Sequence, residues 1–124
     1  MAKSSTEIII GKDTKYEVVL RVEATGGRGF SAFIYGGDKP HVGATVLVSP
    51  KLEEQVLTLD GSEENADSRT ALFIARYIAD AFREPCAAAA GVEIRGADEK
   101  DLKQLQMNCR AAVTHFVATY DRRN

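Results

Sequence analysis

The sequence contains no tryptophan, and only two cysteines, two histidines and three prolines occur among its 124 residues. Long apolar runs are missing as well. A membrane-spanning helix needs about 20 consecutive apolar residues, which no stretch of this chain provides. Residues 1–7 lack the apolar segment of a signal peptide. We therefore expect a cytoplasmic protein that does not enter a membrane.

A basic excess is also missing, because 16 lysines and arginines face 18 aspartates and glutamates, for a formal net charge of −2. Proteins that bind nucleic acids or anionic membranes usually carry a surplus of positive charge. Nucleic acid is therefore not among the expected partners.

Neither a metal site nor a catalytic residue is predicted from the sequence. Cys86 and Cys109 belong to no CxxC pair and to no Cys/His cluster with metal-ligand spacing. We expect both to be buried free thiols, since a free cysteine packs as a small apolar side chain. His41 and His115 lie on separate expected elements, and no Gly-x-Ser-x-Gly nucleophile elbow occurs.

Strand patterns dominate the first half of the chain. Residues 16–24 alternate in hydropathy, and after the glycine-rich turn at 25–29 residues 30–35 return as a hairpin partner. Residues 42–48 are nearly all apolar, which is typical of a central strand covered on both faces. Three further strands are expected, at residues 7–10, 55–59 and 86–94.

Two amphipathic helices are expected in the second half. The first has Asp67 or Ser68 as its N-cap and ends before Pro85, and the second begins at Asp98. The chain length suits one domain, residues 1–124. The element order predicts an α+β fold, an antiparallel β-meander followed by α-β-α, with about six strands and two helices packed on one face.

The segment between two expected strands is the main candidate for a ligand or partner site. It comprises Gly36, Gly37, Asp38, Lys39, Pro40, His41 and Gly43. Glycine amides can approach an anion, a lysine can pair with phosphate, and a histidine can exchange a proton near neutral pH. A turn-rich loop without function explains the same residues. Arg95, at the end of the strand at 86–94, is a second candidate for binding an anion. The alternative is that it is only a charge exposed to solvent.

Two surfaces are candidates for protein contacts. Phe73 and Tyr77 lie on the side of the first helix opposite its apolar stripe, and with Phe33, Tyr35 and Leu47 they suggest a subunit interface. Residues 53–67 contain six acids and no lysine or arginine. That acidic stretch fits a solvated edge, or a docking surface for a basic partner.

The sequence Gly-Gly-Asp-Lys-Pro-His-Val-Gly-Ala at residues 36–44 follows the hairpin and leads into an apolar strand. This region resembles the prenylated-flavin chaperone-like family, the D-subunit proteins linked to gallate-type decarboxylases, whose fold is similar to that of proteasome assembly chaperones. Pro40-His41-Val42-Gly43-Ala44 is its most specific part, and the similarity extends over most of the chain.

The resemblance implies a cytoplasmic homodimer without catalysis of its own. Such a protein would help a UbiD-type decarboxylase acquire or mature its prenylated FMN, which would be bound as cargo. The residues themselves leave two alternatives open. One is a small enzyme acting on a phosphorylated or carboxylated metabolite, with Lys39 and Arg95 holding the anion and His41 moving a proton. The other is an interaction scaffold.

Overall fold

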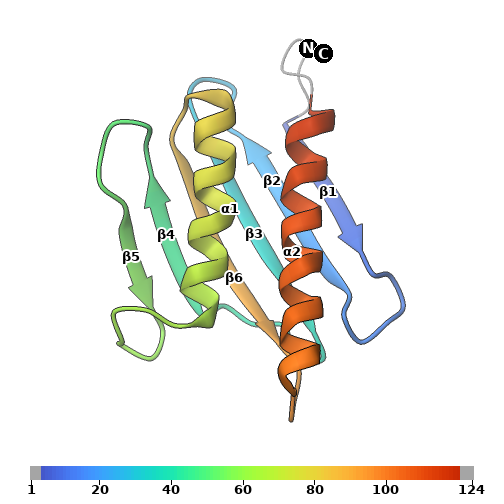
Figure 1. Ribbon diagram of the computed structural model, residues 1–124. Helices are drawn as coiled ribbons and strands as arrows, with labels where there is room; N and C mark the ends of the chain where they lie inside the picture. The colour runs from blue at the N-terminus through green and yellow to red at the C-terminus, as the bar shows by residue number, and fades with distance from the viewer. Residues whose placement is uncertain (1–3, 121–124) are drawn as a thin grey trace.

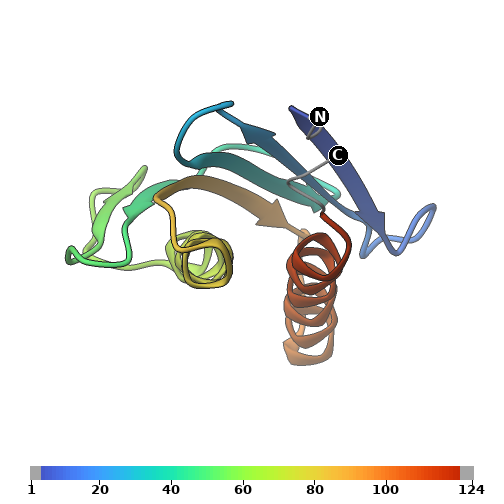
Figure 2. The same ribbon diagram turned by 90° about the horizontal axis from the view of Figure 1, so that it is seen from above.

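The computed structural model describes residues 4–120 and has two layers, a six-stranded sheet and two helices that cover one of its faces (Figures 1 and 2). The elements in chain order are β1 (Ser5–Ile10), β2 (Val18–Ala24), β3 (Phe30–Gly37), β4 (Ala44–Val48), β5 (Gln55–Thr58), α1 (Ala66–Phe82), β6 (Cys86–Glu93) and α2 (Glu99–Thr119). The predicted α+β class, the strand number and the placement of both helices on one face are confirmed.

The sheet has the strand order β1-β2-β3-β6-β4-β5. β3 and β6 are parallel, with Phe30 opposite Cys86, and every other pair is antiparallel. β6 therefore separates β3 from β4, although these two strands are close in sequence. The chain that joins β3 to β4 must pass the end of β6, and this crossing positions the candidate segment.

The core lies between the sheet and the helices. Alternate strand residues face inward, and Leu20, Ile34 and Val46 pack there with Ile74 of α1 and Phe116 of α2, all fully buried. No described helix covers the opposite face (Figure 2). The prediction that residues 42–48 are covered on both faces is wrong. That strand begins at Ala44 and its residues alternate between buried and exposed, because only the inward face has a helix against it.

The helix caps differ in part from expectation. α1 is capped by Asn65, whose side chain accepts a hydrogen bond from the Ser68 amide while the Asn65 amide donates to Ser68 Oγ. The prediction of Asp67 or Ser68 as N-cap is wrong, because both residues lie within the first turn, where Ser68 completes the capping box and Asp67 binds His41. The cap of α2 at Asp98 is confirmed.

Both cysteines are buried and free, as predicted, and burial raises the pKa of each thiol to about 12. These thiols are therefore neutral at physiological pH, which suits packing and not nucleophilic attack. Within residues 4–120 no helix is long and apolar enough to cross a membrane.

Candidate functional site

The segment Gly36–Gly43 is held along the end of β6 by backbone hydrogen bonds. The amides of Lys39, His41 and Gly43 donate to the carbonyls of Glu93, Gly91 and Ala90 at 3.2, 3.3 and 2.8 Å. The prediction that the loop starts at Gly36 is wrong, since β3 continues through Gly37. The segment is thus an extension of the sheet and not a free loop.

A Cβ would overlap neighbouring atoms at three points of this crossing, which are Gly37, Gly91 and Gly43. Gly37 has φ +76°, and a Cβ there would overlap the carbonyl oxygen of Glu93. A Cβ at Gly91 would overlap the carbonyl of His41, and one at Gly43 would overlap the carboxylate of Asp67. The glycines of the motif therefore have structural reasons to be present.

His41 is hydrogen-bonded through both ring nitrogens. Nδ1 lies 2.9 Å from the carbonyl oxygen of Lys39, and Nε2 lies 2.9 Å from Oδ2 of Asp67, whose Oδ1 accepts from the Val92 amide at 3.1 Å. A neutral imidazole can donate to only one of these two oxygens, whereas the imidazolium donates to both.

The hydrogen bond to the Lys39 carbonyl and the nearby Asp67 carboxylate raise the pKa of His41, and burial opposes them. Because both ring nitrogens are engaged by oxygen atoms of the chain itself, His41 is placed to hold the segment on α1. Sequence reasoning missed Asp67 as its partner. An acid at the second position of α1 is usually explained by the helix dipole.

The remaining predicted residues lie at the rim. The Asp38 carboxylate accepts from the Arg95 amide, with N–O distances of 3.1 and 3.3 Å, so the structure brings Arg95 to the candidate segment. The side chains of Lys39, Pro40 and Arg95 are exposed.

A cleft of about 400 Å³ adjoins His41. Its ionisable lining groups are His41 and three carboxylates, those of Asp60, Asp67 and Glu93, while Lys39 and Arg95 are not part of the lining. Hydrogen bonds from Ser62 lower the pKa of Asp60 to about 2, so this acid is ionised at neutral pH. The carboxylates outnumber the cation, and the cleft is therefore poorly suited to an anion.

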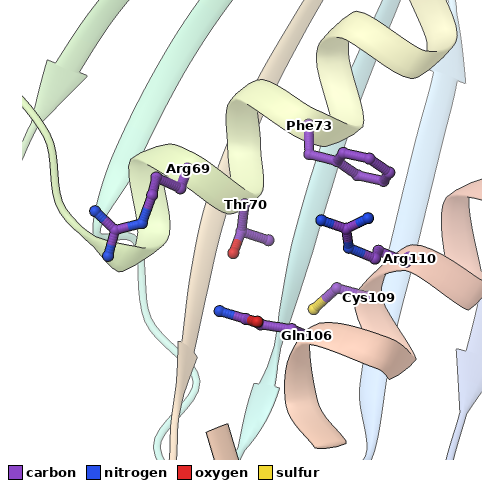
Figure 3. Close-up of a pocket in the computed structure, with 6 residues that line it drawn as sticks. All are labelled: Arg69, Thr70, Phe73, Gln106, Cys109 and Arg110. Carbon is purple, nitrogen blue, oxygen red and sulfur yellow. The ribbon is translucent and has the colours of Figure 1, made fainter. Parts of the chain in front are cut away.

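Phe73 lines a groove between α1 and α2 (Figure 3), and Tyr77 lines its continuation along the two helices. Their ring centroids are 5.7 Å apart, and the guanidinium carbon of Arg110 lies 4.5 Å from the centroid of Phe73. Phe73 is half-buried, and Tyr77 is 37% exposed. Sequence reasoning did not single out Arg110, although it shares the groove-facing side of α2 with Val117.

The outward face of the sheet is the other apolar surface. Leu47 and Leu57 are 52% and 75% exposed, and Phe33 and Tyr35 lie beside each other on the same face with centroids 4.8 Å apart. Within residues 4–120, no group of three or more histidine, cysteine, aspartate or glutamate side chains could hold a metal ion.

Comparison with known families identifies the group to which the chain is related. The family model of the prenylated flavin chaperone LpdD-like domain matches residues 12–121. The chain belongs to this prenylated flavin chaperone LpdD-like family. The resemblance seen in residues 36–44 is thereby confirmed.

This LpdD-like domain is also similar to a chain in the crystal structure of a chaperone complex for yeast 20S proteasome assembly. The TM-score is 0.57, the sequence identity is 12%, and 94% of each chain is covered. Identity this low shows a shared fold and nothing more. A search of curated proteins found no match.

Proposed function

We propose that the protein is a cytoplasmic, non-catalytic accessory chaperone of a UbiD-type decarboxylase, and that it carries prenylated FMN for delivery to, or maturation in, that enzyme. The observation that carries the proposal is the match of the prenylated flavin chaperone LpdD-like family model over residues 12–121. The site geometry supports a non-catalytic role, because both nitrogens of His41 are engaged in structural hydrogen bonds.

The segment Gly36–Gly43, with Arg95, is proposed as the contact for the decarboxylase. Backbone pairing to β6 and the bond between His41 and Asp67 fix its shape, so exposed Lys39 and Pro40 are presented on a rigid support. A preorganised surface loses little conformational entropy on binding. The acidic lining of the adjoining cleft argues that the segment contacts a protein rather than a flavin phosphate.

One experiment tests the accessory role. The purified protein is titrated with prenylated FMN by fluorescence, and an apo UbiD-type decarboxylase is then reconstituted with and without the loaded protein. We expect saturable binding and a larger yield of active decarboxylase. Lys39→Glu should bind the flavin normally and lose most of the gain in reconstitution, whereas Arg28→Glu, a matched change in the β2–β3 turn, should keep it.

Absence of flavin binding together with no gain in reconstitution would refute the proposed function. If Lys39→Glu delivers the flavin as well as the unaltered protein does, the segment is not the contact, and the accessory role itself stands.

A further inference from the structure

The groove between α1 and α2 consists of two hollows that share Phe73. α1 and α2 lie side by side on the same face of the sheet (Figures 1 and 2). A hollow of about 140 Å³ lies near the start of α1 and is lined by polar groups as well as Phe73. A second hollow of about 440 Å³ lies further along both helices. Sites for small molecules usually enclose about 300–1,000 Å³, so the two hollows together have a suitable size.

Of the two arginines that line the smaller hollow, Arg110 has no acidic partner among the described residues. Arg69 pairs with Glu64 at 3.1 Å, and its side chain points away from the other lining residues in Figure 3. No carboxylate within residues 4–120 lies at ion-pair distance from Arg110, and its guanidinium covers the ring of Phe73. Gln106, one helical turn earlier, adds an amide to the same hollow (Figure 3). A guanidinium and an amide are donors suited to a phosphate.

The larger hollow has an apolar wall. The tilted rings of Phe73 and Tyr77 stand on α1 beside Ala81, and Val117 of α2 completes the wall. Aromatic rings in this arrangement can pack against the face of another planar ring system. Asp80 is a carboxylate in the lining, and Arg76 is paired with Glu54 at 2.9 Å.

We propose that this groove is the flavin site, with the phosphate bound by Arg110 and Gln106 and the ring system packed on Phe73, Tyr77 and Val117. The inference rests on the proposed function and places the cargo on the helical layer, away from the segment Gly36–Gly43. The distribution of groups matches an amphiphilic ligand, because Arg110 and Gln106 line the smaller hollow, the apolar wall lines the larger one, and the two hollows meet at Phe73. Cys109, at the buried side of the smaller hollow, is neutral and adds no charge that would repel a phosphate.

The test compares FMN with riboflavin, which has the same ring system and no phosphate. Each flavin is titrated by fluorescence into the full chain, and prenylated FMN is titrated in parallel. Arg110→Glu should weaken FMN and prenylated FMN binding at least tenfold and leave riboflavin affinity nearly unchanged. Phe73→Ala should weaken all three ligands. Arg110→Lys should recover part of the preference for FMN, because it restores the charge without the planar fork.

The controls separate the groove from the rest of the surface. Arg28→Glu makes the same charge change in an exposed turn, and Lys39→Glu makes it on the candidate segment, and both should bind FMN as the unaltered protein does. If Arg110→Glu and Phe73→Ala bind FMN normally while Lys39→Glu does not, the groove proposal is overturned and the proposed function survives. If the unaltered protein binds no flavin at all, the proposed function fails and the groove proposal fails with it. Riboflavin binding by Arg110→Glu also shows that this variant is folded.

Discussion

At the residue scale, the bond between His41 and Asp67 connects three parts of the chain. It ties the segment Gly36–Gly43 to the first turn of α1, and Asp67 in turn accepts from the Val92 amide at the end of β6. The Asp67 carboxylate thus binds both the imidazole of His41 and a backbone amide of β6, at the place where β6 separates β3 from β4. Charge-assisted hydrogen bonds of this kind are stronger than neutral ones.

The protonation of His41 should therefore be visible in the pH dependence of stability. A pKa raised on folding stabilises the protein fully below the unfolded value of about 6.5, and this stabilisation is lost as the pH rises through the folded pKa. We expect the free energy of unfolding to fall as the pH rises above about 6.5. In His41→Gln this fall should be smaller, and at pH 6 the variant should be less stable by about 1–2 kcal/mol.

Urea denaturation at several pH values measures this effect. His115→Gln is the matched control, because His115 is exposed on α2, and it should follow the unaltered protein. An unchanged pH dependence in His41→Gln would contradict a structural role for the imidazolium.

At the scale of the elements, the parallel pairing of β3 and β6 depends on close backbone approach. The two strands stay in register as far as Gly37 and Glu93, where a Cβ would overlap the Glu93 carbonyl. The alanines of β6 leave room for α1 to pack on the same strand, and the buried ones, such as Ala88 and Ala90, belong to the core. The crossing therefore depends on small residues in both strands.

Gly37→Ala should test this close approach. The substitution places a Cβ at φ +76° and against the Glu93 carbonyl, so we expect a loss of roughly 2–4 kcal/mol in the free energy of unfolding. Gly26→Ala is the matched control, because Gly26 has φ +82° with no atom within 4 Å of the added Cβ. It should cost only the conformational penalty, about 1–2 kcal/mol. Equal losses in the two variants, measured by urea denaturation, would show that the contact with Glu93 carries no energy.

The elements could be predicted from local patterns, and their order in the sheet could not. Period-two alternation indicates β2, and Pro85 and Asp98 indicate helix boundaries. The insertion of β6 beside β3 depends on pairing between residues more than fifty positions apart, which no local pattern encodes. For the same reason the local pattern predicts only a capping role for Asp67 or Ser68, since the partners of Asp67, His41 and Val92, are adjacent to it only in the folded chain.

At the scale of the whole molecule, the two layers offer two different surfaces. The helical layer has the groove with Arg110 and Phe73, and the sheet has an outward face that no described element covers. The motif at residues 36–44 indicates the family from the sequence alone. The groove is formed by α1 and α2 together, so it can be recognised only once the fold is known. If a second copy covers the sheet, the groove stays open to a ligand.

We propose that the protein forms a homodimer through the outward face of the sheet. Strands lie about 4.8 Å apart and rise about 3.3 Å per residue, so six strands of four to eight residues present roughly 600 Å² per copy. That area, with flanking side chains, approaches the roughly 800 Å² per partner of a stable interface. Phe33, Tyr35, Leu47 and Leu57 give the face an apolar surface. Phe73 and Tyr77, which the sequence predicts as interface residues, line the groove between the helices and do not lie on this face.

Light scattering after size-exclusion chromatography tests this arrangement. The unaltered protein should have twice the 13.5 kDa mass of one chain, and Leu47→Lys should shift it to the monomer, because each interface would then bury two unpaired ammonium groups. Leu102→Lys is the matched control, since Leu102 is 50% exposed on α2 and Leu47 is 52% exposed on β4. It should remain dimeric. Dissociation by Tyr77→Lys and not by Leu47→Lys would place the interface on the helices, where it would compete with flavin for the groove.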